Sequence, residues 1–230
     1  MTQPSTSTTN EVVAYYDQIA QKYDEDRFGN TYGRFIDAQE RRVLRSLHVE
    51  PAGTLDLPCG TGRLTDFAER GADASEEMLK VARHRHPEKP FLLADATQTG
   101  LDSESVKTVM SFHFLMHLDE ETVEKVVEEM CRIIEKGGRW ICDIPSQKRR
   151  RLTNRKQELW HGNTSMTVKQ MKALCKGRFE VRRVHGLMLT PIHRVPKRMR
   201  KMMCRVDYAL ANSWLMKNYS SYLVFELVKL

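Results

Sequence analysis

The chain lacks several features that would set it apart from ordinary globular proteins. It has no apolar run near the roughly 20 residues that a membrane-spanning helix needs. Residues 1–10, MTQPSTSTTN, lack the basic and apolar regions of a secretory signal, so we expect a disordered leader there. The five cysteines are odd in number and form no CxxC pair, which argues against a disulfide framework and a zinc site. We therefore expect a cytoplasmic protein without a metal centre.

The composition is that of a globular domain with a basic charge. The 230 residues are 40% hydrophobic and 29% charged, which fits a single domain over residues 11–230. The net charge of +7 is concentrated in two basic clusters, at residues 148–156 and 194–205, whereas residues 120–129 are acidic. Basic clusters attract anionic partners such as phosphorylated metabolites, nucleic acid or a lipid surface. The plain alternative is that each cluster is a solvated helix face.

Strand and helix periods alternate along the chain after a mostly helical segment at residues 11–47, which is broken near residues 28–30. This order predicts an α/β fold whose mostly parallel sheet is covered by helices on both faces. Residues 190–218 separate the last two expected strands by more than a hairpin needs, and we interpret them as a helical cap over a pocket. We expect strands at residues 55–57, 91–94, 106–112, 140–144, 179–189 and 222–228, and helices at 63–70, 75–85, 120–135 and 167–176.

The most informative stretch is TLDLPCGTG at residues 54–62. A short apolar strand ends in an acid and breaks into a turn with two glycines, which let a backbone approach a ligand closely. The helix expected directly after this turn would offer unpaired N–H groups at its N-terminus. The pattern predicts a nucleotide-type loop at the carboxyl end of a strand, where ligands of such sheets bind.

The letters LDLPCGTGRL resemble the first motif of class I S-adenosylmethionine (SAM)-dependent methyltransferases of the small-molecule type. Further segments are similar to that family's later motifs in the same order, and the ordered set is more specific than any single motif. The resemblance implies a Rossmann-like, doubly wound sheet with an antiparallel last strand. These segments are YYD at residues 15–17, GADASEEML at 71–79, LADA at 93–96, SFHFLMH at 111–117 and IEKGGRW at 134–140.

The resemblance implies SAM as the cofactor and assigns roles to particular residues. Asp73 would accept hydrogen bonds from the ribose hydroxyls, a task that suits the two oxygens of a carboxylate. Asp95 would bind the adenine amino group, with a backbone donor from Ala96 and packing from Met78. The implied cofactor-binding residues are Tyr16, Tyr23, Asp56, Pro58, Cys59, Gly60, Thr61, Gly62, Asp73, Ala74, Met78, Asp95, Ala96, Ser111 and Phe112.

Two departures from the family pattern concern the cofactor site. Pro58 stands where the first glycine usually lies, which stiffens the turn and removes one N–H donor. Asp73 comes only eleven positions after Gly62, so the helix at 63–70 is cut to about two turns, or ~12 Å. The second strand is then either vestigial or a piece of the chain is missing. A displaced Asp73 would weaken ribose binding by roughly 1.5–3 kcal/mol.

Methyl transfer from a sulfonium is an in-line displacement, so the protein mainly aligns the nucleophile with the methyl group. An oxygen nucleophile often needs a base, and His117 or His113 is the nearest candidate. The alternative is that each histidine only lines the pocket or caps a helix. His161, His185 and His193 lie in the variable half, and the sequence does not decide whether they face a substrate.

The leading hypothesis is transfer of a methyl group to an oxygen or nitrogen of a small metabolite that is anionic, sugar-linked or lipid-linked. The residues 190–218 and 147–165 would form its cap, and the basic, Met-rich part near residues 197–205 would also suit a membrane surface. A second hypothesis is an RNA methyltransferase that uses the two basic clusters, although no RNA-binding module is visible. A third is a non-catalytic scaffold. The oligomeric state cannot be deduced.

Overall fold

The computed structural model describes residues 6–153, 164–192 and 195–230. The described strands form one seven-stranded sheet in the order β3-β2-β1-β4-β5-β7-β6. Strands β3, β2, β1, β4 and β5 pair in parallel, whereas β7 is antiparallel to both β5 and β6. The predicted Rossmann-like sheet with an antiparallel last strand is confirmed. The strands are β1 (Thr54–Asp56), β2 (Arg70–Asp73), β3 (Phe91–Leu93), β4 (Val106–Ser111), β5 (Ile134–Pro145), β6 (Phe179–Leu187) and β7 (Tyr222–Lys229).

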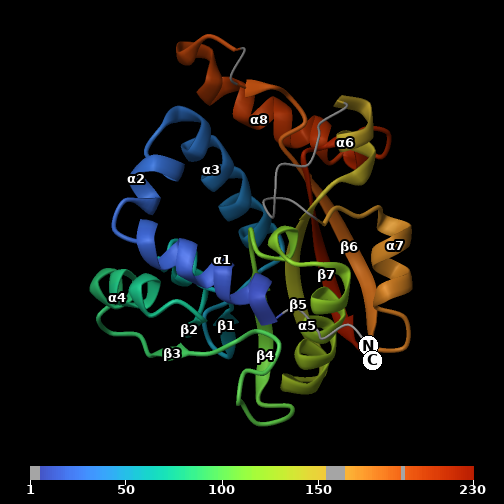
Figure 1. Ribbon diagram of the computed structural model, residues 1–230. Helices are drawn as coiled ribbons and strands as arrows, with labels where there is room; N and C mark the ends of the chain where they lie inside the picture. Colours follow the sequence, from blue (N-terminus) through green and yellow to red (C-terminus); the bar gives the residue numbers. More distant parts are fainter. Residues whose placement is uncertain (1–5, 154–163, 193–194) are drawn as a thin grey trace.

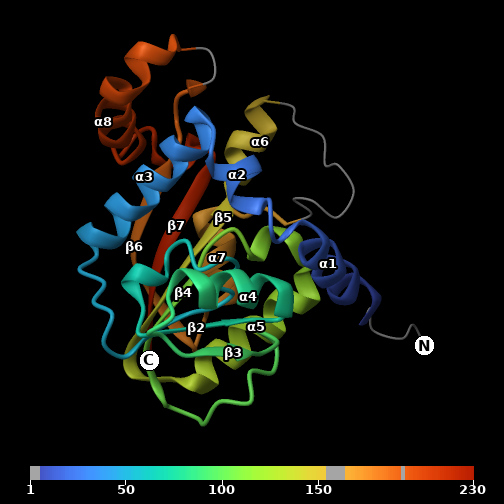
Figure 2. The same ribbon diagram turned by 90° about the vertical axis from the view of Figure 1, so that its left-hand side faces the viewer.

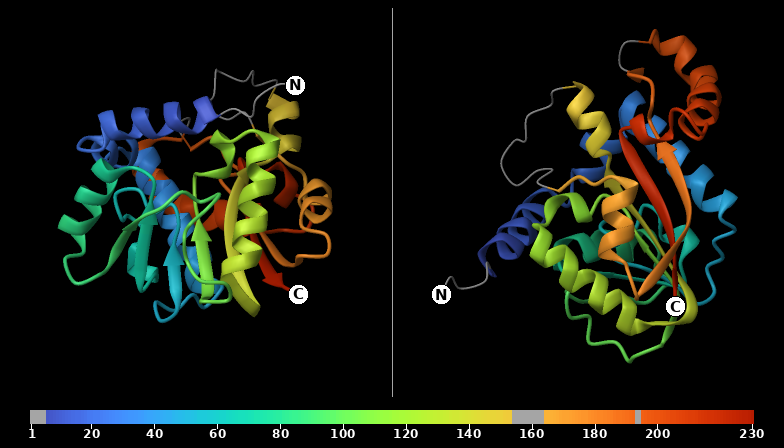
Figure 3. Two further views of the ribbon diagram at one scale, coloured as in Figure 1. Left: turned by 60° about the horizontal axis from the view of Figure 1, so that its bottom comes forward. Right: turned by 90° about the vertical axis from the view of Figure 1, so that its right-hand side faces the viewer.

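Helices cover both faces of the sheet, and α1 lies across the end toward which β4 points (Figures 1 and 3). The segment at residues 11–47 is helical with breaks before residue 23 and before residue 31, close to the predicted interruption. The α-helices are α1 (Thr6–Ile19), α2 (Tyr23–Phe28), α3 (Thr31–Ser46), α4 (Glu76–Arg85), α5 (Glu120–Ile133), α6 (Gln147–Thr153), α7 (Val168–Leu174) and α8 (Arg200–Ala211). Short 3-10 helices are η1 (Thr65–Phe67), η2 (Leu115–His117), η4 (Lys197–Met199) and η5 (Lys217–Tyr219).

Alternate residues of the central strands face two separate hydrophobic cores. Val109 and Trp140 pack with α5 and α7, whereas their neighbours Met110 and Ile141 pack with α3 on the opposite face. This alternation is the period-2 consequence of strand geometry. Figure 2 shows α3 along one face of the sheet. The central strands are therefore held from both sides, which fixes the strand ends that carry the site.

The local signals at helix ends are confirmed in part. Ser75 caps α4, because its hydroxyl accepts the N–H of Met78 at 3.1 Å. The helix predicted at residues 120–135 ends earlier, at Ile133, and Gly137 does not stop it. Instead Ile134 is extended and buried, and it begins β5 opposite Val106. Pairing with β4 therefore overrides the helical period at this point.

The helix predicted at residues 63–70 is absent: the structure has only the single turn η1 between β1 and β2. Strand β2 already begins at Arg70 and ends at Asp73, and the N–H of Glu69 donates to the carbonyl of Thr54. The ammonium group of Lys89 donates to the carbonyls of Thr65 and Ala68, beside the η1 bond from the Ala68 N–H to the Thr65 carbonyl. The second strand is short but complete, since it pairs with both β1 and β3. The shortened connection thus removes the helix and leaves the strand in place.

Two further predictions concern the ends and the insert. The leader predicted over residues 1–10 overlaps α1, which begins at Thr6, and residues 1–5 lie outside the described residues. The predicted helical insert at 190–218 contains α8, which packs on α3 and β6. Residues 154–163 and 193–194, which hold parts of both basic clusters together with His161 and His193, lie outside the described residues. No helix in the described ranges is long and apolar enough to cross a membrane.

Candidate functional site

A pocket opens at the carboxyl ends of β1, β2 and β4, where the strand order switches between β1 and β4. It encloses about 1080 Å³ of space, part of which is open solvent at its mouth. Its walls come from the segments at residues 56–61, 73–75, 94–97 and 112–114, and from α1. Four strand ends and one helix from far apart in the chain therefore build one cavity.

Most of the sequence-predicted cofactor residues line this pocket, and two do not. Among the described residues, Gly62 and Ser111 are absent from its lining. Ser111 is a buried support: its hydroxyl donates to the carbonyl of Leu57 at 2.6 Å and accepts the indole N–H of Trp140 at 3.0 Å. The predicted residues in the lining are Tyr16, Tyr23, Asp56, Pro58, Cys59, Gly60, Thr61, Asp73, Ala74, Met78, Asp95, Ala96, Phe112, His113 and His117.

The loop after β1 presents its backbone to the pocket at Gly60. A Cβ built on Gly60 would meet no atom within 4 Å, and the residue has a φ of +53°. The N–H of Gly60 donates to Oδ2 of Asp73 at 2.7 Å. Gly62 serves a different purpose, since it lies against Ala82 and His86 of the α4 region, with a φ of +75°. The two glycines therefore have separate roles, one at the cavity and one in helix packing.

Asp73 lies between the loop and the start of α4, and its two carboxylate oxygens accept the N–H groups of Gly60 and Ser75. Burial raises the pKa of Asp73 to about 6, although these backbone donors favour the charged form. Each carboxylate oxygen has a second lone pair, so the group keeps capacity for ligand hydroxyls. Asp73 is buried but lines the pocket. Its position suits the predicted role at a ribose, which stays a prediction.

Asp56 is the acid at the end of β1, and it also lines the pocket. Its Oδ2 accepts the hydroxyl of Thr65 at 2.7 Å. Burial raises the pKa of Asp56 to about 7, against the opposing effects of Thr65 and of the Arg63 charge. The end of β1 therefore carries a carboxyl group that changes charge near neutral pH.

The far end of the pocket is built by the turn after β3. Oδ1 of Asp95 accepts both the N–H and the hydroxyl of Thr97, each at 2.7 Å, which locks the turn. Asp95 itself is exposed, whereas Ala96 and Met78 are buried in the lining. An exposed acid, a backbone segment and a thioether around one recess can bind the polar edge and the face of a base.

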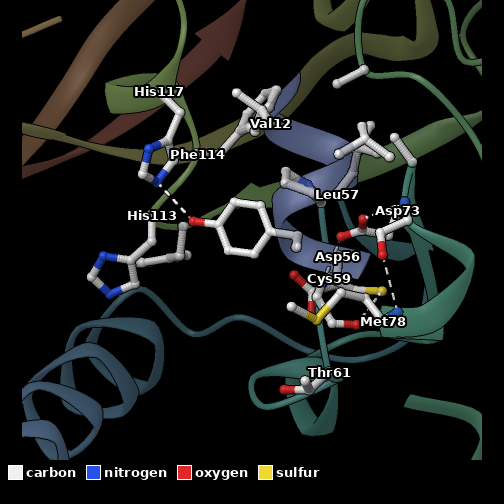
Figure 4. A pocket seen from close by; sticks show the side chains of 18 of the residues that line it. Val12, Asp56, Leu57, Cys59, Thr61, Asp73, Met78, His113, Phe114 and His117 are labelled. Carbon is white, nitrogen blue, oxygen red and sulfur yellow. Dashed lines mark hydrogen bonds between the residues drawn. The ribbon is translucent and has the colours of Figure 1, made fainter. Parts of the chain in front are cut away.

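Helix α1 forms the roof of the pocket with Val12, Val13 and Tyr16. It is fixed to α4 because Oδ1 of Asp17 accepts the hydroxyl of Ser75 at 2.5 Å. The Tyr16 hydroxyl lies 3.1 Å from Nε2 of His117, the hydrogen bond drawn to His117 in Figure 4. The roof is therefore tied both to the start of α4 and to the side of the pocket that carries His117.

The two candidate histidines lie on the same wall but have different surroundings (Figure 4). His117 is buried in η2, with Nε2 against Tyr16. His113 has a φ of +54°, and its Nε2 lies 2.5 Å from Oε1 of Glu40 on α3. Because Glu40 is charged, Nε2 of His113 carries the proton and donates. His113 is therefore held by α3, whereas His117 faces the roof.

Glu40 is the centre of a buried charge network that the sequence reasoning missed. Burial opposes its ionisation, but the charges of Arg63 and His113 lower the pKa of Glu40 to about 2. Arg63 donates to Glu40 at 2.7 Å and to Asp37 at 2.6 Å, and it stacks on Phe28 at 3.9 Å from the ring centroid. A signal did exist, because Glu40 falls on the apolar stripe of α3 that includes Ile36 and Leu44.

Asp143 completes this network behind His113. Its Oδ1 accepts the backbone N–H of His113 at 2.7 Å, and its Oδ2 lies 3.8 Å from Nδ1 of the same ring. Burial raises the pKa of Asp143 to about 6. His113 thus stands between two buried carboxyl groups from different elements, which fixes its orientation at the pocket wall.

The remaining lining residues were not predicted, and most of them are apolar. They could not be singled out, because an apolar residue facing a cavity has the same sequence signature as one facing the core. They are Val12, Val13, Phe28, Leu57, Arg63, Leu64, Ser75, Ala94, Thr97, Phe114, Leu118 and Thr122.

The predicted cap does not cover this pocket. No described residue of 190–218 belongs to the lining, and α1 takes that place. The reason is packing: Met203 and Tyr208 of α8 join the core around α3, and the buried Asp207 bonds Gln39 at 2.6 Å. These contacts hold α8 against the outer side of α3.

Comparisons with known proteins show what the central segment is similar to. Residues 55–142 match the family model described as a methyltransferase domain. A demethylmenaquinone methyltransferase of Renibacterium salmoninarum is 31% identical over 144 residues, which are 57% of each chain. One from Thermotoga maritima is 27% identical over 143 residues, 58% of this chain and 61% of that protein. The chain thus spans about three fifths of the length of these curated relatives.

Solved structures share the whole fold at low sequence identity. A SAM-dependent methyltransferase of Thermotoga maritima, described as a possible histamine N-methyltransferase, has a TM-score of 0.68 and 18% identity, covering 94% of this chain and 98% of its own. Geranyl diphosphate C-methyltransferase of Streptomyces coelicolor A3(2), solved with S-adenosyl-L-homocysteine, has a TM-score of 0.65 and 14% identity over the whole of both chains.

Residues 55–142 are therefore similar to the methyltransferase-domain family, and the predicted resemblance to class I SAM-dependent methyltransferases is confirmed. The Rossmann-like fold is confirmed as well, and SAM is the cofactor that this enzyme family uses.

Proposed function

We propose that the protein transfers a methyl group from SAM to an oxygen or nitrogen of a small metabolite. The observation that carries this proposal is the single pocket that joins Asp73 and Asp95 to His117 across the strand switch. Its polar groups at one end suit an adenosyl moiety, and its histidine and aromatic wall at the other suits an acceptor. We keep anionic, sugar-linked and lipid-linked metabolites as acceptor classes, and the cytoplasm as the proposed location.

The pocket residues fit SAM at several points. Asp73 would accept the ribose hydroxyls, Asp95 and Ala96 would hold the adenine edge, and Gly60 would let the backbone approach the ligand. Bound there, SAM supplies an electrophilic methyl group on its sulfonium. The protein's own contribution is to exclude water under α1 and to hold the acceptor in line with that methyl group.

His117 is the proposed proton acceptor for an O–H or N–H nucleophile. Its Nε2 lies 3.1 Å from the hydroxyl of Tyr16, and this hydrogen bond to an O–H group inside the pocket supports the assignment. His113 is less suited, because its Nε2 donates to Glu40. We therefore assign His113 to orienting the wall, and His117 to accepting the proton.

Calorimetry with SAM and with its demethylated product tests cofactor binding. We expect both to bind, and Asp95→Ala to weaken SAM about tenfold, as the loss of roughly 1.4 kcal/mol would. The absence of binding at about millimolar ligand would favour the scaffold hypothesis instead. Unchanged affinity in Asp95→Ala would remove that residue from the site and leave the fold assignment intact.

Turnover of His117→Ala on the true acceptor tests the base. If the acceptor must lose a proton, we expect kcat to fall by about 10²–10⁴-fold with SAM affinity unchanged. His185→Ala is the matched control, since His185 is half-buried at β6 beside Asn212, outside the pocket lining. Turnover of His117→Ala near that of the unmodified protein would mean that alignment alone drives the reaction.

Transfer to carbon is the second candidate, because the curated relatives are demethylmenaquinone methyltransferases and one structural neighbour is a C-methyltransferase. A ring carbon made nucleophilic by a deprotonated hydroxyl would use the same His117. Methyl-labelled SAM with quinol, amine and hydroxyl acceptors distinguishes the cases, because the product methyl resonance depends on the atom it joins. A labelled RNA product with strongly salt-dependent binding would support the RNA hypothesis instead.

A further inference from the structure

The exposed face of α8 and the loop that follows it gather apolar side chains that a lone surface helix has no reason to carry. Met199, Met202, Val206 and Leu210 are spaced by three and four residues, so they form one stripe along the helix. Trp214 is 87% exposed and Leu215 69% exposed directly beyond the helix end. We call these six residues together the α8 surface.

A row of cations runs beside this stripe. Arg198, Lys201 and Arg205 are exposed and follow the same three- and four-residue spacing, one position before the apolar residues. Between residues 195 and 219 the sequence has one acid, Asp207. It is fully buried on the other side of α8, where it accepts the amide of Gln39 and the N–H of Thr190. The α8 surface and the cations beside it therefore combine apolar groups with positive charge, and residues 195–219 contribute no exposed acid there.

Helix α6 adds exposed apolar and cationic residues at the same end of the molecule. Lys148 lies over the ring of Tyr219 at 5.9 Å, and Arg149 donates to the carbonyl of Tyr219. Leu152 of α6 is 67% exposed and is preceded by Arg151, which is also exposed. Figure 3 shows α6 and α8 projecting from the same end of the molecule, away from the C-terminus.

This end of the molecule is the end that holds the pocket. Strand β5 is parallel to β4, and β4 is parallel to β1, so all three strands end at the same edge of the sheet. The helix α6 begins at Gln147, two residues after β5 ends at Pro145. A flat partner against α6 and α8 would therefore lie at the pocket edge of the sheet.

We propose that the α8 surface docks the protein on a bilayer that contains anionic lipids. Exposed tryptophan, leucine and methionine side chains would enter the interface between headgroups and acyl chains, and the row of cations would meet lipid phosphates. The row of cations favours an anionic bilayer, because its positive charge is complementary to anionic headgroups. A neutral lipid surface or an apolar protein groove would gain nothing from these cations. Delivery of a lipid-linked acceptor from the bilayer to the pocket would follow, and that consequence alone rests on the proposed function.

Flotation of the full-length protein with unilamellar vesicles tests the docking. The vesicles contain phosphatidylcholine alone or with about 30% phosphatidylglycerol, at about 0.1 M NaCl where exposed charges still act. We expect at least about tenfold stronger binding to the anionic vesicles, with binding falling as salt rises. Equal binding to both vesicle types, or no binding, would overturn the proposal.

Two pairs of variants separate the apolar and the charged parts. The pair Trp214→Ser with Leu215→Ser and the pair Lys201→Glu with Arg205→Glu should each lower binding at least about tenfold, since one basic residue is worth a factor of about five near an anionic leaflet. The controls Leu93→Ser, at another exposed apolar residue, and Lys125→Glu on α5, should bind vesicles as before. Vesicle binding that survives both pairs of substitutions contradicts the assignment.

Folding and cofactor binding are followed in the same variants. All of them should keep the circular dichroism spectrum and the SAM affinity of the unmodified protein, because none of the substituted residues lines the pocket. If neither the unmodified protein nor any variant binds SAM but the unmodified protein still binds anionic vesicles, the proposed function is rejected and the docking proposal stands. Single-stranded RNA is also tested in place of vesicles. If the protein binds RNA but not vesicles, and if the pair Lys201→Glu with Arg205→Glu abolishes RNA binding, the bilayer is not the partner.

Discussion

The hydroxyl of Tyr16 and Nε2 of His117 lie 3.1 Å apart across the pocket, although 101 residues separate them in the chain. Burial raises the pKa of Tyr16, so its hydroxyl stays neutral at ordinary pH. This contact joins the roof helix α1 to the loop after β4. It also places the proposed base under the roof helix, where the His117 side chain is buried.

The variant Tyr16→Phe removes the hydroxyl and its hydrogen bond but keeps the aromatic ring, so it distinguishes the effects of the two groups. We expect Tyr16→Phe to lower the free energy of unfolding by about 1 kcal/mol, the usual net contribution of such a bond. The affinity for SAM should change less than about threefold, because the ring still lines the pocket. Denaturant unfolding and calorimetry measure the two effects. Tyr15→Phe, at a partly exposed neighbour, is the control, and a larger loss of SAM affinity in Tyr16→Phe would mean that the hydroxyl itself binds the cofactor.

Binding of SAM should depend on pH through Asp73, whose pKa is about 6. Only the charged carboxylate can accept both ribose hydroxyls without donating, so affinity should rise with pH through this value. At pH 5 about a tenth of Asp73 is charged, and we expect roughly tenfold weaker binding than at pH 7.5. Calorimetry across this range checks it. Asp73→Asn should bind weakly with a nearly flat pH profile; a profile as steep as that of the unmodified protein would assign the titration elsewhere.

The same carboxyl group should affect folding stability with a defined sign. Its pKa is higher in the folded chain, about 6, than in an unfolded one, about 3.9. The folded state therefore binds more protons between these values, and the stabilisation from Asp73 is present below pH 4 and lost as the pH rises through 6. Urea unfolding at several pH values should show a shallower decline for Asp73→Asn. Asp56 and Asp143 act in the same direction and would remain in that variant.

The buried network around Glu40 should be sensitive to truncation. Glu40→Ala leaves Arg63 and His113 without the carboxylate between them, and we expect a loss of about 3–5 kcal/mol in the free energy of unfolding. Glu121→Ala is the matched control, because Glu121 and its partner Lys125 are both exposed and the loss of that pair should be undetectable. A small effect of Glu40→Ala would show that water replaces the lost contacts.

Gly62 and Gly100 offer a matched pair for the loop geometry, since their φ angles are +75° and +73°. Alanine at either position bears the cost of a left-handed backbone, about 1 kcal/mol or more. At Gly62 the new Cβ would also lie 3.2 Å from Ala82 and from His86, whereas nothing lies within 4 Å at Gly100. Thermal unfolding should therefore show the larger loss for Gly62→Ala. Equal losses would mean that α4 moves away without cost.

Features carried by neighbouring residues could be predicted from the sequence. The strand and helix order, the Ser75 cap and the acid at the end of β1 depend on contacts within a few residues, so their patterns are visible in the chain. The prediction of a helix after Gly62 was wrong, because the backbone groups there bond to distant residues instead. Lys89 donates to the carbonyl of Ala68, and the carbonyl of Thr54 accepts the N–H of Glu69. The helix end before Gly137 was misplaced because pairing between Ile134 and Val106 outweighs a local stop signal.

The sequence by itself determined the α/β order, the residues at the strand ends and the resemblance to a methyltransferase domain, because each is encoded over short stretches. Only the tertiary structure decided that α1 rather than α8 covers the pocket and that Glu40 holds His113. Those contacts join residues 73 or more positions apart. Burial and charge determine which of many distant pairs form, and these properties exist only once the core has packed.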